Sequence, residues 1–133
     1  MGLDMYLFSK EKHPDNTDFS IAKDTESSEI AYWRKHSALH ALMYEVYQKN
    51  GGTCSFDEFN CVPVRLSIRD LNYILRRIKD ADLTATSGFF FGSTDYMKDY
   101  MDSYEQEYDI QSIARAMREI SVSDKDVYYD SWW

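Results

Sequence analysis

The sequence predicts a single α+β domain in which three helices pack on a small, mainly antiparallel sheet. Three observations lead to this fold class: an alternating segment at the N-terminus, three stretches with helical spacing of apolar residues, and a β-prone C-terminal tail. The chain has 133 residues, which suits one domain over residues 1–133. Hydrophobic residues make up 44% of it, so the bulk of the chain is expected to fold around one core.

The first expected element is a strand. Leu3, Met5 and Leu7 are separated by single, more polar residues, which is the period of a half-buried strand. Residues 9–28 are mostly polar and predict a long surface loop. Two further strands are expected: the three phenylalanines at 89–91, which stand between glycines, and the tail at 122–133, which we expect to pair with the N-terminal strand.

Three helices account for most of the remaining chain. The first is predicted over about 28–50, with Ser28 as its N-cap and two glycines after it. The second follows Ser67 and ends near residue 80. The third is predicted to begin after the Ser-Thr-Asp cluster at 93–95 and to run to about residue 120, with Tyr104 and Tyr108 on its apolar row.

Charge limits the kinds of partner. Fifteen basic and 23 acidic residues give a net charge of −8 and an acidic isoelectric point, so direct binding to nucleic acid or to an anionic membrane is not expected. No apolar run approaches the length of a membrane span, and the N-terminus lacks the pattern of a signal peptide. We therefore expect a cytoplasmic protein.

The two cysteines do not favour a metal site or a disulfide. Cys54 and Cys61, with His36 and His40, could form a Cys₂His₂ zinc site, but the cysteines are farther apart than structural zinc usually requires. Reduced, partly buried thiols are the expected state in a chain without an export signal. No cofactor and no metal ion is predicted.

A row of acids on the third helix is the first candidate binding surface. At helical spacing these acids fall on one stripe, with tyrosines beside it, and a cationic partner would relieve their mutual repulsion. Two alternatives stay open: the stripe is merely solvated, or the basic residues at 65–79 neutralise it. The residues of this partner-binding hypothesis are Asp95, Asp99, Asp102, Asp109, Tyr100, Tyr104 and Tyr108.

An anion site is the second candidate. The unpaired backbone N–H groups at the start of the third helix attract phosphate or carboxylate, and the first helix could add cations, imidazoles and a stacking ring. The alternative is that Ser93 and Thr94 simply cap the helix, where Asp95 would repel an anion. The residues of this ligand-binding hypothesis, which suits a nucleotide-like anion, are Trp33, Arg34, Lys35, His36, His40, Gly92, Ser93 and Thr94.

Catalysis receives little support from the sequence. A serine or cysteine could be paired with a histidine on paper, but no strand-turn-helix nucleophile motif or oxyanion motif surrounds such a pair. No catalytic residue is predicted, and we expect the chain to be a binding protein. The alternative is a cryptic enzyme that acts on a nucleotide-like anion.

Three motifs carry a resemblance to a known family. MGLDMYL at 1–7, AYWRKH at 31–36 and TSGFFFGSTDY at 86–96 resemble a family of small proteins common in tailed bacteriophages and prophages. The resemblance implies a phage or prophage source and no particular activity. Together with the acidic stripe it leads to the expectation of a non-catalytic protein that binds, and inhibits, a host defence or nucleic-acid-handling protein. A role in the virion also stays open.

Overall fold

Within the described residues, one sheet and three helices form two layers. The computed structural model describes residues 3–22, 26–83 and 99–133. In chain order its elements are β1 (Asp4–Lys10), β2 (Ser27–Arg34), α1 (Ser37–Lys49), the short 3₁₀ helix η1 (Phe56–Glu58), β3 (Val64–Arg65), α2 (Ile68–Lys79), α4 (Tyr104–Ser121) and β4 (Asp126–Trp132).

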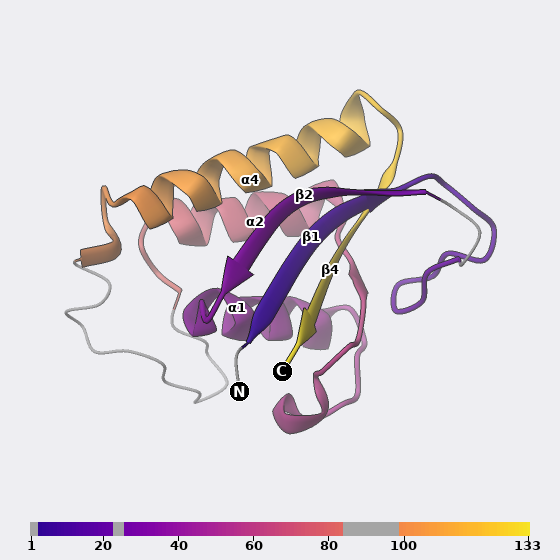
Figure 1. Ribbon diagram of the computed structural model, residues 1–133, viewed down its shortest axis with the longest axis horizontal. Helices are drawn as coiled ribbons and strands as arrows, with labels where there is room; N and C mark the ends of the chain where they lie inside the picture. The colour runs from indigo at the N-terminus through magenta and orange to yellow at the C-terminus, as the bar shows by residue number, and fades with distance from the viewer. Residues whose placement is uncertain (1–2, 23–25, 84–98) are drawn as a thin grey trace.

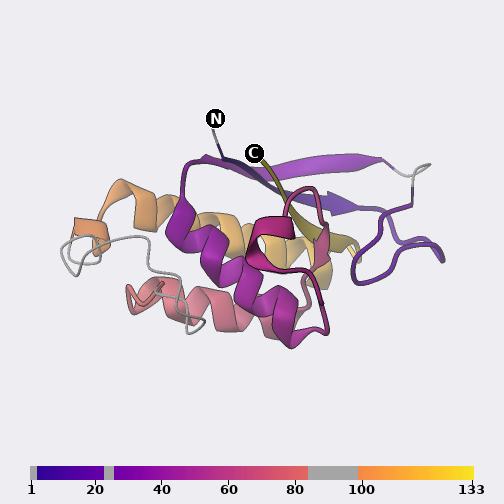
Figure 2. The same cartoon turned by 90° about the horizontal axis from the view of Figure 1, so that it is seen from below.

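The sheet has the strand order β2-β1-β4-β3, and every neighbouring pair is antiparallel (Figure 1). The predicted pairing of the tail with the N-terminal strand is confirmed, with Leu7 opposite Tyr129. Figure 2 shows all three helices on the same side of the sheet. The α+β class, with three helices on an antiparallel sheet, is therefore confirmed for the described part of the chain.

The core lies between the sheet and the helices because each element turns its apolar side to that space. Met5 and Leu7 of β1 and Val127 and Tyr129 of β4 are fully buried there. Each of the three helices also contributes completely buried side chains to this core. They are Leu39, Leu42 and Met43 of α1, Leu71, Ile74 and Ile78 of α2, and Ile113 and Ala116 of α4.

The prediction of one helix over 28–50 is wrong in its first part. Residues 27–34 form β2, which pairs with β1 and turns Ala31 and Trp33 into the core and Tyr32 outward. Ile30 and Trp33 fit helical spacing as well as a strand with a bulge, and the irregular register beside Leu7 supplies that bulge. Pairing with β1 decides between helix and strand for this segment. The edge of β1 provides backbone hydrogen-bond partners that the local spacing of apolar residues does not reveal.

The loop predicted over residues 9–28 is shorter in the structure than expected. The strand β1 extends to Lys10 and β2 begins at Ser27, so the excursion between them is shorter at both ends. Asn16 fastens it: its amide nitrogen donates to an Asp126 carboxylate oxygen at 2.9 Å, and its oxygen accepts from the Ala22 N–H at 2.8 Å. The predicted strand at 89–91 lies outside the described residues.

The helix α2 follows the prediction closely. Ser67 is its N-cap: the hydroxyl accepts a hydrogen bond from the Asp70 N–H, and the Asp70 carboxylate accepts one from the Ser67 N–H. This reciprocal pair is the capping box expected from Ser67 followed three residues later by an acid. The chain leaves the helix at Asp80, as the sequence indicates.

The third helix differs from its prediction in its start and its buried face. Residues 99 and 100 are helical, but Asp102 has a φ of 62°, so the chain turns there and α4 begins afresh at Tyr104. Ser103 caps this new start by accepting from the Gln106 N–H. The first half of α4 buries Gln106 and Asp109 and leaves Tyr104 and Tyr108 exposed, which reverses the predicted apolar row.

No helix among the described residues is long and apolar enough to cross a membrane.

Candidate functional site

Asp109 lies at the centre of a buried polar cluster. Its carboxylate is fully buried on the face of α4 that meets the sheet and α1. One oxygen accepts a hydrogen bond from Trp33 Nε1 at 2.6 Å, and the other accepts from His36 Nε2 at 2.7 Å and from the Tyr100 hydroxyl at 2.5 Å. Because a carboxylate only accepts, Nε2 is the protonated nitrogen of His36.

The sequence places these donors through one sharp turn. Trp33 points into the core from β2, and His36 stands at the N-cap position of α1. Lys35 between them has a φ of 59°, and its N–H donates to the Leu3 carbonyl at 2.8 Å. A left-handed lysine is uncommon, so the junction is held by its surroundings, which direct the Trp33 and His36 side chains toward the same carboxylate.

A surface pocket opens beside this cluster. It has a volume of about 380 Å³, and its walls come from the end of β2, the turn into α1 and the first turns of α4. Arg34 and Lys35 bring positive charge to it, while Glu105 and the partnered Asp109 bring negative charge. Its lining residues are Tyr32, Trp33, Arg34, Lys35, His36, Tyr104, Glu105, Tyr108 and Asp109.

Tyr108 fixes one wall of the pocket to the sheet. Its hydroxyl donates to the Tyr32 carbonyl at 3.2 Å and accepts from the Tyr32 N–H at 3.1 Å. These are backbone groups on β2, an edge strand, so the tyrosine satisfies groups that would otherwise face solvent or another chain. The Tyr108 ring also meets the Trp33 ring edge-on, with centroids 5.9 Å apart.

The structure brings together parts of both predicted residue sets. Trp33, Arg34, Lys35 and His36 of the ligand-binding hypothesis line the same pocket as Tyr104, Tyr108 and Asp109 of the partner-binding hypothesis. Asp95, Gly92, Ser93 and Thr94 lie outside the described residues.

The acidic stripe is corrected. Asp99 precedes the turn at 101–103 and Asp102 lies within it, and both are exposed. Asp109 is buried in α4, so these three acids do not form one outward ridge. Tyr100 is buried as well, because its hydroxyl reaches Asp109. Tyr104, by contrast, is 91% exposed. The buried residues of α4 include Gln106, Asp109, Ile113 and Ala116, which follow helical spacing. The buried face of the helix is therefore apolar at Ile113 and Ala116 and polar toward its N-terminus.

His40 does not join the pocket. It is buried under η1 and the C-terminus, where its Nδ1 lies 2.6 Å from the Tyr129 hydroxyl and Phe56, Phe59 and Trp133 surround its ring. Its Nε2 has no hydrogen-bond partner within the described part of the chain. Burial lowers the pKa of His40 to about 4, so the ring is neutral at pH 7 and belongs to the core.

Two arginines of the basic block at 65–79 form ion pairs with acids outside 95–109. Arg65 Nη2 lies 2.8 Å from an Asp18 carboxylate oxygen. Arg77 Nη1 lies 3.1 Å from the buried Glu45 carboxylate. Burial opposes the charge on Arg77, but Glu45, Tyr73 and Asp82 outweigh it and raise the pKa of Arg77. The sequence analysis did not predict a role for Glu45. An acid within an otherwise apolar stretch of the first helix does, however, indicate a buried ion pair.

The described walls of the pocket are made of aromatic and charged side chains. Among its described lining residues there is no serine, threonine or cysteine to act as a nucleophile. Cys54 and Cys61 are both free, and within residues 3–22, 26–83 and 99–133 no three metal-ligating side chains lie together. Comparisons with protein-family models, curated proteins and solved structures found no match to this chain.

Proposed function

We propose that this protein is a non-catalytic binding protein of a phage or prophage that captures a host protein in the cytoplasm. The surface that supports this is the tyrosine surface, defined as Tyr32, Tyr104 and Tyr108 around the pocket together with Met101. All four are large apolar side chains with more than two-fifths of their area exposed. Exposed tyrosine rings are typical of protein interfaces, because the ring supplies a large contact area and the hydroxyl can form a hydrogen bond.

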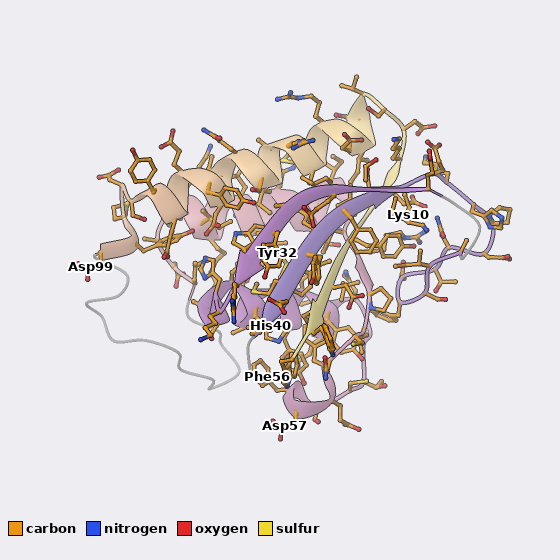
Figure 3. The ribbon with its side chains drawn as sticks, viewed as in Figure 1. Lys10, Tyr32, His40, Phe56, Asp57 and Asp99 are labelled. Carbon is orange, nitrogen blue, oxygen red and sulfur yellow. The ribbon has the colours of Figure 1, made fainter. Side chains whose placement is uncertain are left out.

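The charge around the tyrosine surface indicates the kind of partner. Asp99, Asp102, Glu105 and Glu107 are exposed at the same end of the molecule. Figure 3 shows Asp99 at the far end of the helical layer, away from the loop that follows β1. Glu105 and Glu107 also stabilise the positive end of α4, so their presence there has a structural reason. The proposal therefore depends more on the exposed tyrosines than on these acids. A cationic surface on a host defence or nucleic-acid-handling protein would complement this corner.

Tyr104 is the residue with which to test this proposal. A photo-reactive amino acid at position 104 should crosslink one host protein in infected cells, whereas the same group at Val122, which is 76% exposed at the other end of α4, should not. Tyr104→Ala should weaken capture of that protein about tenfold or more, as expected for an interface tyrosine, and change the free energy of unfolding by less than about 0.5 kcal/mol. Equal crosslinking from both positions, or full capture by Tyr104→Ala, would contradict the proposal.

A second candidate function is binding of a nucleotide-like anion in the pocket. The observation that favours it is that Arg34 and Lys35 line the pocket beside the Trp33 and Tyr108 rings, which could stack on a base. A cryptic enzyme acting on such an anion would use the same pocket.

Thermal unfolding separates this candidate from protein capture. If ATP, cyclic AMP or cyclic di-GMP binds with a dissociation constant of about 10 μM, then about 1 mM of it should stabilise the protein by about 2.7 kcal/mol and raise its melting temperature by several degrees. Arg34→Ala at the end of β2 should abolish that rise. Arg118→Ala, which removes an exposed arginine near the C-terminal end of α4, away from the pocket, should retain it. No rise with any of the three would remove this candidate.

A further inference from the structure

The sheet has one face that the helices leave uncovered, and aromatic side chains project from it. The helices all lie on the opposite side, as Figure 2 shows. Along β1, Met5 and Leu7 point into the core, so Tyr6 and Phe8 point to the uncovered face, where both are half-buried. The Tyr6 ring packs against the Tyr32 ring with centroids 5.4 Å apart.

Strand register brings two carboxylates beside these rings. Tyr6 lies directly opposite Asp130 of β4, and Phe8 lies directly opposite Glu29 of β2. Residues paired in this way have their side chains on the same face of the sheet. These four residues, with Ser27, line a pocket of about 270 Å³, which we call the sheet pocket.

Among the described residues, the wall of the sheet pocket carries two carboxylates and no cation. The Ser131 N–H donates to the Asp130 carboxylate at 2.8 Å, and neither Asp130 nor Glu29 makes an ion pair within the described part of the chain. Burial raises the pKa of Asp130, and the hydrogen bond from the Ser131 N–H offsets this only in part. Lys10, the next residue on this face of β1, is buried at the strand end and does not line the pocket.

We propose that the sheet pocket binds an arginine side chain on a basic segment of a protein partner. A guanidinium group stacks on aromatic faces and donates planar pairs of hydrogen bonds to carboxylates, and Tyr6, Phe8, Glu29 and Asp130 supply both kinds of contact. Its positive charge also complements the carboxylates of Glu29 and Asp130, neither of which forms an ion pair with another described residue. The sheet pocket does not use Tyr104 or Tyr108, so this inference goes beyond the proposed function and stands without it.

A titration with a short arginine peptide tests this inference. The probe is an acetylated, amidated Gly-Arg-Gly-Arg-Gly peptide, and its control is the same peptide with citrulline, which keeps the shape of arginine without the charge. In two-dimensional NMR spectra, the arginine peptide should shift the amide signals of Tyr6, Phe8 and Ser27 and saturate at millimolar concentration or below. The citrulline peptide should bind about tenfold more weakly or not at all.

Matched variants separate recognition in the sheet pocket from attraction to an acidic protein. Glu29→Gln and Asp130→Asn preserve side-chain shape and should each weaken binding about fivefold or more. Asp57→Asn changes the net charge equally at exposed η1, which Figure 3 shows at the edge of the molecule, and should leave binding unchanged. The inference is overturned if all three variants bind alike, if the citrulline peptide binds equally, or if no saturable shift occurs by about 10 mM. Loss of host-protein capture in Tyr104→Ala has no bearing on these results.

Discussion

Replacing Asp109 with alanine should lower the free energy of unfolding by about 3 to 5 kcal/mol, which is a large share of the stability of a small domain. The substitution removes the carboxylate that accepts from Trp33 Nε1, His36 Nε2 and the Tyr100 hydroxyl. Each donor has already lost its water on folding, so without an acceptor it keeps the cost of desolvation. Chemical denaturation followed by circular dichroism at pH 7 measures the effect.

Asp99→Ala is the matched control for Asp109→Ala. Asp99 belongs to the same predicted acidic stripe but is exposed, so its removal should change the stability by less than about 0.5 kcal/mol. Asp109→Asn should also be costly, because an amide has one accepting oxygen where the carboxylate uses two. If Asp109→Ala and Asp99→Ala cost the same, Asp109 is not the buried acceptor described above.

Acidification from pH 6.5 to pH 4 should remove about 3 kcal/mol of stability through His40 alone. The pKa of His40 falls from an ordinary 6.5 in the unfolded chain to about 4 in the folded protein, with burial as its cause. The unfolded chain therefore binds a proton in this pH range that the folded protein does not. The contribution of His40 is complete above pH 6.5, decreases as the pH falls through the range, and is constant below about 4.

His40→Phe removes this titration and keeps an aromatic ring between Phe59 and Trp133. It should be less stable than the wild type at pH 7, since Tyr129 loses its partner, but its stability should fall less steeply with pH. The measurement is the difference in unfolding free energy between variant and wild type at several pH values, which cancels other groups such as Asp130. Identical slopes for His40→Phe and wild type would refute the prediction.

The elements that could be predicted are those whose local signals agree with their tertiary surroundings. Alternation marks β1, a capping box and one apolar stripe mark α2, and β-prone residues mark β4. The strand β2 was missed because Ile30 and Trp33 satisfy two periods at once, and the choice depends on hydrogen bonds to β1. Local propensity is a weak guide when a neighbouring strand offers an unpaired edge.

The sequence identified several residues of the candidate site but did not predict that they lie together. Trp33, His36, Tyr104 and Tyr108 line one pocket, but the two hypotheses had assigned them to separate sites. A clue to the role of Asp109 was present: counting back four residues from the buried Ile113 reaches it on the same face of the helix. An acid on such a row is normally read as exposed, because a buried charge is costly unless donors surround it.

Hydrophobic periodicity and composition were sufficient for the class of the fold, for the pairing of the tail with β1 and for the surplus of acidic charge. They could not show which acids meet solvent. Asp109 turns inward because Trp33 and His36, which are 76 and 73 residues away in the chain, bring their N–H groups to it. Asp130 and Glu29 share the uncovered face because the strand register places them there. A charge is buried or exposed according to the donors that surround it, and these come from segments that only the folded chain brings together.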